Sequence, residues 1–316
     1  APLKDGLGGV SLSANWMWAC KNEGEDARLY EAVESCSNFA IELGINIPTG
    51  KDSLSMKQKY PDGDVIAPGT VIISAAANCI DINKVVEPVL KHTDDAIYYI
   101  NLSQDAHELG GSSFAQILNK IGKNTPGIQD AASFKKAFNA VQELINTDKI
   151  IAGHDIGSGG LITTLLEMCF ADNGLAADYD LSAIGESDSV KLLFSENIGI
   201  VFQADASAED YLKSQNVEFF KIGKVTSNDS VTIKNGEFSV SLNVAETRDT
   251  WYKTSYLLDK KQSGNVKALE RFTNYKNQPL EYDDKATRKL IDCIKVMSKN
   301  ELLIIFKGGI KKTIRI

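Results

Sequence analysis

The chain has 316 residues, of which 43% are hydrophobic and 24% are charged, a composition typical of a globular protein with one large or two average domains. Its formal net charge of -8 argues against nucleic-acid binding, which depends on clustered lysines and arginines that neutralise phosphates. Five scattered cysteines without a C-x-x-C pair favour a reducing cytoplasm over a disulfide framework or a zinc site, and the short apolar runs predict no membrane association.

The first part of the chain predicts a helix, a strand, a loop and a strand, in that order. Apolar residues at helical spacing run from Leu29 to Leu43, just before a glycine, which is typical of an amphipathic helix. We expect a short strand at 45–48, a loop through "IPTGKDSLSM" at 47–56, and a buried strand at 69–79, because the apolar run there is continuous. This order indicates an α/β fold.

The second part, from Lys91 onward, predicts a longer alternation of strands and helices. The expected strands are 96–102, 149–156, 175–181, 198–204 and 219–225, and the expected helices are 112–121, 133–147, 160–173 and 245–261. Asn235 and Gly236 stand between two alternating runs, which predicts a β-hairpin with a type I′ turn. The last residues are basic and fit either a helix and a hairpin or a segment foreign to the rest.

A glycine-rich turn, "GHDIGSGG", joins an expected strand to an expected helix. Unpaired N–H groups at a helix start, together with the helix dipole, favour an anion. Asp155, at the end of the strand, is suited to a divalent cation that bridges phosphates, whereas we expect His154 to point to the opposite face. The alternative is that the glycines only permit a tight turn, with Asp155 or Ser158 capping the helix.

The segment "TGKDSLSM" leaves a similar choice open. Lys51 offers a positive charge for phosphate, Ser53 a hydroxyl donor, and Gly50 a close approach of the backbone, although the spacing is not that of a P-loop. Asp52 favours a cation or a sugar hydroxyl as its partner. The alternative is a solvated surface loop.

Other candidates are isolated residues. Asn15 is expected to line a site, while the neighbouring Trp16 and Trp18 are expected in the core or at an interface. Glu196, beside a strand, is either a solvated edge glutamate or a further site candidate, and His107 is expected at the surface. The sequence contains no G-x-S-x-G, H-E-x-x-H or paired-cysteine pattern, so neither a serine nucleophile nor zinc chemistry is predicted.

Five motifs in a fixed order carry a family resemblance. They are "LSANWM", "GEDARLYEAV", "IPTGKDSLSM", "HDIGSGGL" with "LLEM", and "LFSENIG". Together they resemble the long form of phosphoribosylformylglycinamidine synthase, of the aminoimidazole ribonucleotide synthetase superfamily, over roughly residues 1–280. The resemblance implies an ATP-dependent ligase of purine biosynthesis, in which ATP and magnesium activate an amide oxygen of formylglycinamide ribonucleotide and ammonia from glutamine displaces the phosphate.

The resemblance also implies a domain organisation of the α/β (α+β) class. The chain resembles most of the second half of a two-half synthetase core. Residues 1–90 are then a partial barrel-forming synthetase domain, residues 91–258 an α/β domain of the aminoimidazole ribonucleotide synthetase type, and residues 259–283 the start of a linker. Residues 284–316 form an atypical tail that is unlike the linker of the family.

The implied ligands are ATP or ADP, Mg²⁺ and a small ribonucleotide substrate. Asp155 matches a magnesium ligand at a second nucleotide site, which in the long enzymes holds an ADP that is not turned over. The candidates for nucleotide and substrate binding are Asn15, Gly50, Lys51, Asp52, Ser53, Gly157, Ser158, Gly159 and Gly160. No catalytic residue is expected within the chain, because the matching positions fall before and after it.

The expected partners are therefore the first synthetase half and the glutaminase domain. Self-association through residues 1–90 is also expected, because strand edges that lack their partner half invite pairing. One departure from the family pattern concerns Gly157 and Ser158, which stand where the family has a serine and an acid. Both stay candidates for nucleotide binding, but the family's side-chain contacts do not carry over to them. The alternatives are a structural half that binds ADP and Mg²⁺ without turnover, or another ATP-using enzyme of the superfamily.

Overall fold

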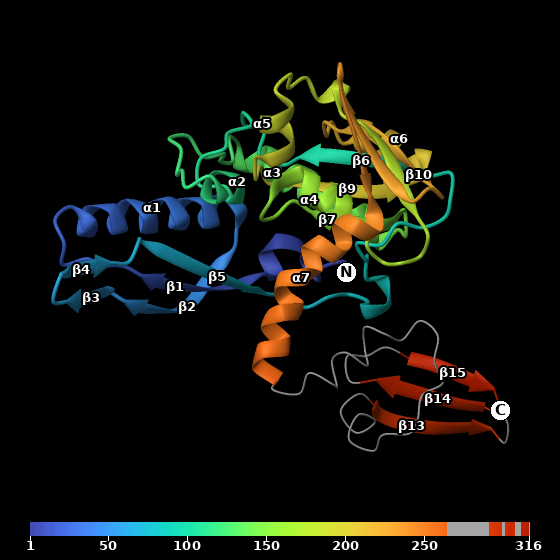
Figure 1. Ribbon diagram of the computed structural model, residues 1–316, viewed down its shortest axis with the longest axis horizontal. Coiled ribbons are helices and arrows are strands. Elements are labelled where there is room, and N and C mark those ends of the chain that lie inside the picture. The colour runs from blue at the N-terminus through green and yellow to red at the C-terminus, as the bar shows by residue number, and fades with distance from the viewer. Residues whose placement is uncertain (264–290, 299–300, 307–310, 316) are drawn as a thin grey trace. The chain divides into compact units, whose positions relative to one another are not determined.

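The computed structural model describes residues 1–263, 291–298, 301–306 and 311–315 (Figure 1). The chain forms two compact units, Ala1–Asp249 and Thr250–Ile316. The first unit contains a three-stranded sheet, a small hairpin and a seven-stranded sheet, and the second contains a separate three-stranded sheet. Helices accompany the sheets of the first unit, which confirms the predicted mixed α/β class.

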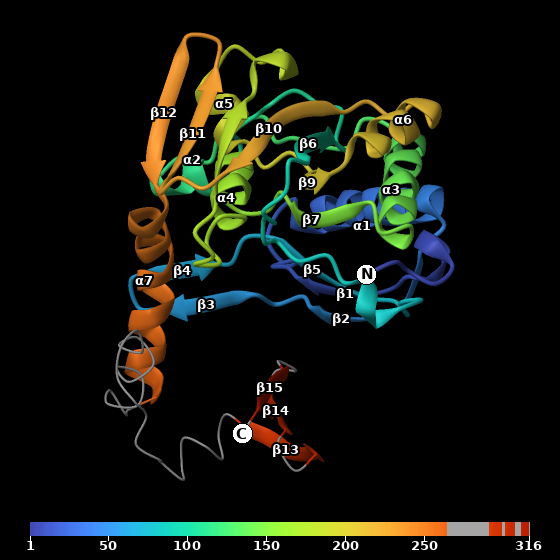
Figure 2. The same ribbon diagram turned by 90° about the vertical axis from the view of Figure 1, so that its right-hand side faces the viewer.

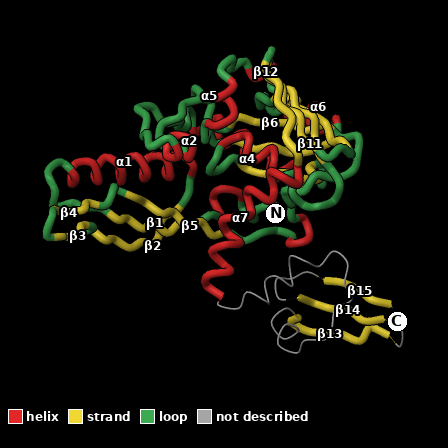
Figure 3. The backbone as a smooth tube through the Cα atoms, viewed as in Figure 1, coloured by secondary structure: helices red, strands yellow, loops and turns green. Residues whose placement is uncertain are grey.

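The first sheet has the strand order β2-β1-β5. The elements of this region are η1 (Gly6–Gly9), β1 (Ser11–Met17), α1 (Glu25–Leu43), β2 (Asn46–Ser53), β3 (Lys57–Tyr60), β4 (Gly63–Ile66), β5 (Thr70–Ala76) and η2 (Ile82–Lys84). Strand β1 runs parallel to β2 and antiparallel to β5, and β3 pairs with β4 in the separate hairpin. Helix α1 lies along one face of the sheet, as Figure 3 shows.

Helix α1 confirms the predicted amphipathic helix. Glu25 and Asp26 lie in its first turn, where negative charge complements the helix dipole. Gly44 ends it with a φ of 77° and donates its N–H to the carbonyls of Ala40 and Ile41, a left-handed cap that glycine adopts without a Cβ clash. Trp16 and Trp18 are in the core, which is the first of the two predicted positions. The apolar side chains packed between α1 and the sheet are Ala14, Trp16, Trp18, Leu29, Ala32, Cys36 and Ile47.

Strand β5 contradicts the prediction that this apolar segment is buried. Val71, Ile72 and Ile73 are 39%, 52% and 40% exposed. The strand stands at the end of the strand order, so within the described chain its outer edge has no neighbouring strand. A continuous apolar run indicates a strand that can be covered on both faces, and here the described residues leave much of it uncovered.

The second sheet has the strand order β12-β11-β8-β10-β6-β9-β7. Its strands are β6 (Ala96–Asn101), β7 (Ile150–Asp155), β8 (Ala176–Asp180), β9 (Gly199–Ala204), β10 (Phe220–Thr226), β11 (Ser230–Asn235) and β12 (Phe238–Asn243). Neighbours are antiparallel except β8 and β11, which run parallel. Strand β6 is buried on both faces, because Tyr99 packs into one hydrophobic cluster and Tyr98 into another.

Helices cover both faces of this sheet (Figure 2). The helices of this region are α2 (Ser113–Ile117), α3 (Ala131–Asn146), α4 (Gly160–Glu167), α5 (Ser189–Phe194), α6 (Ala206–Ser214) and the short η3 (Ser182–Ile184). Helices α3 and α6 pack on the Tyr98 side, and α4 and α5 on the Tyr99 side. Helix α2 is shorter than predicted because Asn119 adopts a φ of 54° and the next N–H, that of Lys120, donates back to Ala115.

The predicted hairpin forms between β11 and β12, but its turn differs from the prediction. Asn235 belongs to the ladder and pairs with Phe238, so Gly236 and Glu237 are the central residues. Gly236 has a φ of 58°, and only this first central residue is left-handed, which fits a type II′ pattern. The reason lies in Asn235, whose buried Nδ2 donates to the carbonyl of Glu186 at 2.9 Å and holds the residue in the strand.

Helix α7 (Val244–Ser263) continues from the first unit into the second. The second unit contains β13 (Ile291–Ser298), β14 (Glu301–Phe306) and β15 (Lys311–Arg315) in an antiparallel sheet of that order. Residues 291–298 thus form a strand where one of the two alternatives for the last residues included a helix, and the expected hairpin is present between β14 and β15. Residues 264–290, which include most of the predicted linker, lie outside the described residues. None of the helices that the structure describes has the length and apolar character needed to cross a bilayer.

Candidate functional site

Strands β1 and β2 bring three of the predicted residues to one face of the first sheet. Asn15 lies opposite Lys51 in the register, and Met17 lies opposite Ser53. Side chains alternate along a strand, and the residues on either side of Asn15 are buried under α1, so all three predicted residues lie on the face away from that helix. Lys51 Nζ donates to Ser53 Oγ at 2.9 Å, which keeps the ammonium and the hydroxyl together on this open face.

Gly50 and Asp52 lie on the other face, and the predicted loop is wrong because β2 extends to Ser53. A Cβ at Gly50 would lie 2.2 Å from the carbonyl oxygen of Ala14, so this glycine allows the close approach of two strands. Asp52 is paired with Trp16 and is exposed. The ladder continues past the strand, since the N–H of Trp18 donates to the Ser53 carbonyl at 2.9 Å.

His154 and Asp155 end strand β7, and their side chains meet. His154 Nδ1 lies 3.3 Å from Asp155 Oδ1, and His154 Nε2 lies 2.7 Å from Glu167 Oε2. Both residues belong to the ladder with β9, yet their side chains meet, so the prediction that the two neighbours point apart is wrong. The side chain of Asp155 is 86% exposed, so a cation has access to its carboxylate, while Glu167 in α4 orients the imidazole.

The glycine-rich turn that follows Asp155 is held by the chain itself. Gly159 and Gly160 have φ values of 93° and 77°, which favour glycine. The N–H of Gly160 donates to the carbonyl of Gly157 at 3.1 Å, and the N–H of Gly159 donates to Glu196 Oε1 at 2.9 Å. Neither Asp155 nor Ser158 caps the helix through its side chain. The cap comes from Glu196, for which the solvated alternative is therefore wrong.

Two polar residues of the first unit, His107 and Asn197, are buried although no sequence pattern indicated it. His107 is only 8% exposed, its Nε2 has no hydrogen-bond partner among the described residues, and burial lowers the pKa of its imidazole. Asn197 is 2% exposed and its Nδ2 donates to Ser103 Oγ at 2.9 Å. The expected surface position of His107 is wrong, because an isolated histidine between elements has no periodic neighbours that signal burial.

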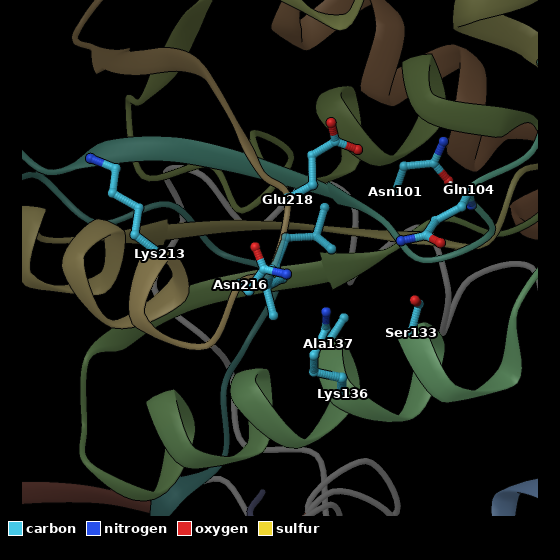
Figure 4. A pocket seen from close by; sticks show the side chains of 10 residues that line it. Asn101, Gln104, Ser133, Lys136, Ala137, Lys213, Asn216 and Glu218 are labelled. Carbon is cyan, nitrogen blue, oxygen red and sulfur yellow. Dashed lines mark hydrogen bonds between the residues drawn. The ribbon is translucent and has the colours of Figure 1, made fainter.

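A pocket of about 430 Å³ opens on the α3 and α6 side of the second sheet (Figure 4). Its lining residues are Ile100, Asn101, Gln104, Ser133, Lys136, Ala137, Lys213, Asn216, Val217 and Glu218. Figure 4 shows the polar ends of Gln104, Lys136 and Asn216 directed toward the same space. None of the residues proposed from sequence lines this pocket, so the predicted candidates fall into two other groups, one on β1 and β2 and one at the turn between β7 and α4.

Two family models match the chain in succession. Residues 1–78 match the FGAR-AT PurM_N-like domain, and residues 93–235 match the C-terminal domain of AIR synthase related proteins. The two matches follow each other in the order that the sequence analysis expected. The predicted domain limits at residues 90 and 258 stay predictions.

Named relatives match both domains together. The Arabidopsis thaliana protein named probable phosphoribosylformylglycinamidine synthase, chloroplastic/mitochondrial, is 40% identical over 264 residues, which cover 81% of this chain and 19% of that protein. The Homo sapiens phosphoribosylformylglycinamidine synthase is 35% identical over 265 residues, which cover 80% of this chain and 20% of that protein. The chain spans about a fifth of the length of the curated relatives it matches.

Solved structures share the fold at lower identity. T. maritima PurL complexed with FGAR superposes with a TM-score of 0.54 and 10% identity, over 95% of this chain and 51% of that chain. Hydrogenase maturation protein HypE in complex with ATP superposes with a TM-score of 0.52 and 17% identity, over 75% and 74%. These likenesses show the fold alone, whereas the named relatives and the two domain matches agree on a family. The chain belongs to the phosphoribosylformylglycinamidine synthase family.

Proposed function

We propose that the chain is part of the synthetase core of a phosphoribosylformylglycinamidine synthase, an ATP-dependent ligase. In this reaction ATP phosphorylates the amide oxygen of formylglycinamide ribonucleotide, and ammonia released from glutamine displaces the phosphate to give formylglycinamidine ribonucleotide. The names of the relatives support the proposal. Structures of PurL with ATP and with FGAR share the fold and fit the same substrates.

The observation that carries this proposal is the shared face of β1 and β2. Asn15 and Lys51 face each other across the two strands, and Lys51 is bonded to Ser53. An amide, an ammonium and a hydroxyl side by side suit the oxygens of a phosphorylated ribose, because each can donate a hydrogen bond and the ammonium adds charge. We assign Ser53 and Lys51 to substrate contact, with the opposite wall of the site supplied by the rest of the synthase.

An amidine-formation assay tests this assignment. The chain is combined with the remaining segments of its synthase, and formylglycinamidine ribonucleotide is measured. We expect Lys51→Ala to lower kcat/KM by about 10-fold to 100-fold, because a charge-assisted contact is lost. Lys59→Ala, which removes another exposed lysine in strand β3, is the matched control and should leave activity unchanged. Absence of amidine formation by the assembled parent protein would reject the ligase assignment.

A second candidate function is structural binding of magnesium and ADP at Asp155. It is favoured by the exposed carboxylate beside the glycine-rich turn, and a PurL of the same fold has been solved with ADP. Calorimetry with Mg·ADP tests it: we expect Asp155→Asn to weaken binding by about 10-fold or more, since a metal ligand loses its charge. Tight Mg·ADP binding without amidine formation in the assembled protein would favour this function over turnover.

The number of protein ligands around Asp155 indicates how a metal ion could bind there. In the part of the chain that the structure describes, no three His, Cys, Asp or Glu side chains gather as a metal site. Magnesium commonly takes one or two protein carboxylates and completes its shell with phosphate oxygens and water. Asp155 therefore suits a magnesium ion that arrives with the nucleotide, and does not suit a metal bound by the protein alone.

The proposed partners are the first synthetase half, the glutaminase domain and, for the chain alone, a second copy. The exposed apolar strand β5 supports this proposal, because a sheet edge of this kind pairs readily with another strand. For the compartment we propose the cytoplasm, which fits four cysteines that stand as free thiols, Cys20, Cys36, Cys79 and Cys169.

A further inference from the structure

Glu196 joins three segments that are distant in sequence. It lies between α5 and β9, and its side chain is partly buried. Its Oε1 accepts the N–H of Gly159 at 2.9 Å and the N–H of Ser113 at 2.8 Å. One carboxylate oxygen therefore binds the start of α4 and the start of α2 at once.

Both contacts satisfy donors that a helix cannot satisfy by itself. The first N–H groups of a helix have no partner within it, and the helix dipole favours a negative charge there. Gly159 is the N-cap residue of α4 and has no side chain to accept a bond, while Ser113 is the first residue of α2. Glu196 supplies the charged acceptor that the local sequence of α4 lacks.

Further contacts join strand β9, which follows Glu196 in the chain, and helix α4 to the strand end that holds Asp155. Asp155 pairs with Ile200 of β9, four residues after Glu196, and the N–H of Ile156 donates to the Gly199 carbonyl at 3.0 Å. The hydroxyl of Thr164 in α4 donates to the Asp155 carbonyl at 3.0 Å. Strand β7, strand β9 and helix α4 thus form a closed ring of contacts, and the bond from Gly159 to Glu196 completes it.

We propose that Glu196 is a positioning residue, which fixes the glycine-rich turn beside Asp155 in the conformation that receives a magnesium-bound nucleotide, without touching the nucleotide. The identity of the ligand in this inference rests on the proposed function. The statement that Glu196 holds the turn does not. The carboxylate already occupies the Gly159 N–H, so a phosphate is bound by other groups around the turn. The conformation of the turn then depends mainly on a hydrogen-bond acceptor at position 196, to which the negative charge adds a smaller contribution through the helix dipole.

Amide hydrogen exchange measured by NMR tests directly whether Glu196 holds the turn. Glu196→Ala removes the acceptor, and we expect exchange at Gly159 and Ser113 to accelerate about 10-fold, the equivalent of one hydrogen bond. Glu196→Gln keeps an acceptor oxygen and should restore slow exchange. The Gly236 amide, which donates to Ser182 Oγ in a different turn, is the internal control. Equal exchange rates at Gly159 in the parent and in Glu196→Ala would overturn the proposal.

Calorimetry with Mg·ADP tests the consequence for the ligand. We expect Glu196→Ala to weaken binding about 10-fold and Glu196→Gln to bind like the parent. Asp188→Ala removes a comparable helix cap, on Val190 and Lys191 of α5, and should lower stability without changing Mg·ADP affinity. Unchanged or tighter binding by Glu196→Ala would overturn the positioning role. If the parent does not bind Mg·ADP, the nucleotide assignment fails, and the exchange experiment still decides whether Glu196 holds the turn.

Discussion

At Gly160 a single methyl group would collide with the backbone of a neighbouring segment. Its Cβ would lie 2.7 Å from the Ser195 carbonyl oxygen and 2.8 Å from that of Leu193, at a φ of 77°. We expect Gly160→Ala to lower the free energy of unfolding by about 2–4 kcal/mol, because strain and a backbone clash add. Gly157→Ala, where a Cβ meets nothing within 4 Å, is the matched control and should stay near the parent in urea denaturation. Similar losses for both variants would contradict this account.

The sequence predicts the placement of individual side chains best where their spacing along one strand determines which face they share. Lys51 and Ser53 are two apart, so in an extended segment they share a face, and the structure adds only the partner strand that brings Asn15 beside them. Glu196 could not be found in this way, because its two partners are 37 and 83 residues away. Long-range contacts of a single side chain leave no periodic signal in a sequence.

At the scale of elements, helix α6 is attached to strand β6 through a charged hydrogen bond. The Tyr98 hydroxyl donates to Glu209 Oε1 at 2.9 Å, and this bond, with help from Lys213 and Lys221, lowers the pKa of Glu209 from its ordinary value of 4.5. Because the pKa is lower in the folded state, the bond stabilises the fold above about pH 4.5, and the contribution is lost as the pH falls through the folded-state pKa.

Tyr98→Phe should therefore cost about 1 kcal/mol of unfolding free energy at neutral pH and flatten its decline between about pH 5 and pH 3. Urea denaturation at several pH values measures both effects. Tyr30→Phe, at a tyrosine that is 68% exposed on α1, is the control and should change neither quantity. A variant at position 98 that kept the full pH dependence of the parent would contradict the role of this bond.

Elements with strong local signals were predicted well, and those that depend on distant contacts were not. Helix α1 has both a periodic apolar face and a glycine cap, and its predicted end agrees with the structure. Strand β2 continues through a segment rich in glycine, lysine and aspartate because pairing with β1 holds it extended. The turn after β11 departs from the Asn-Gly rule because buried bonds retain Asn235 in the strand. Tertiary contacts override local propensity in both cases.

At the scale of the whole molecule, the order of the strands in the second sheet could not be predicted from the sequence pattern. The alternation of elements predicts an α/β class, yet the seven-stranded sheet places β8 between β10 and β11 and β6 between β10 and β9. The same alternation of helices and buried apolar strands is compatible with several different orders of the strands in the sheet. The family resemblance narrows the choice, because it supplies a complete topology that periodicity alone does not contain.

The exposed sheet edge leads to a prediction for the chain as a whole. Strand β5 has apolar side chains on both faces, and Ile72, on the open face with Asn15, is 52% exposed. Unpaired N–H and C=O groups beside such side chains template pairing with a second chain.

We expect the chain alone to self-associate in light scattering, and Ile72→Lys to shift it toward monomer, because the lysine charge would have to be buried at the contact. Ile121→Lys, at an isoleucine that is 82% exposed in a loop, should not change the distribution. A monodisperse monomer of the parent chain would show that this edge is stable without a partner.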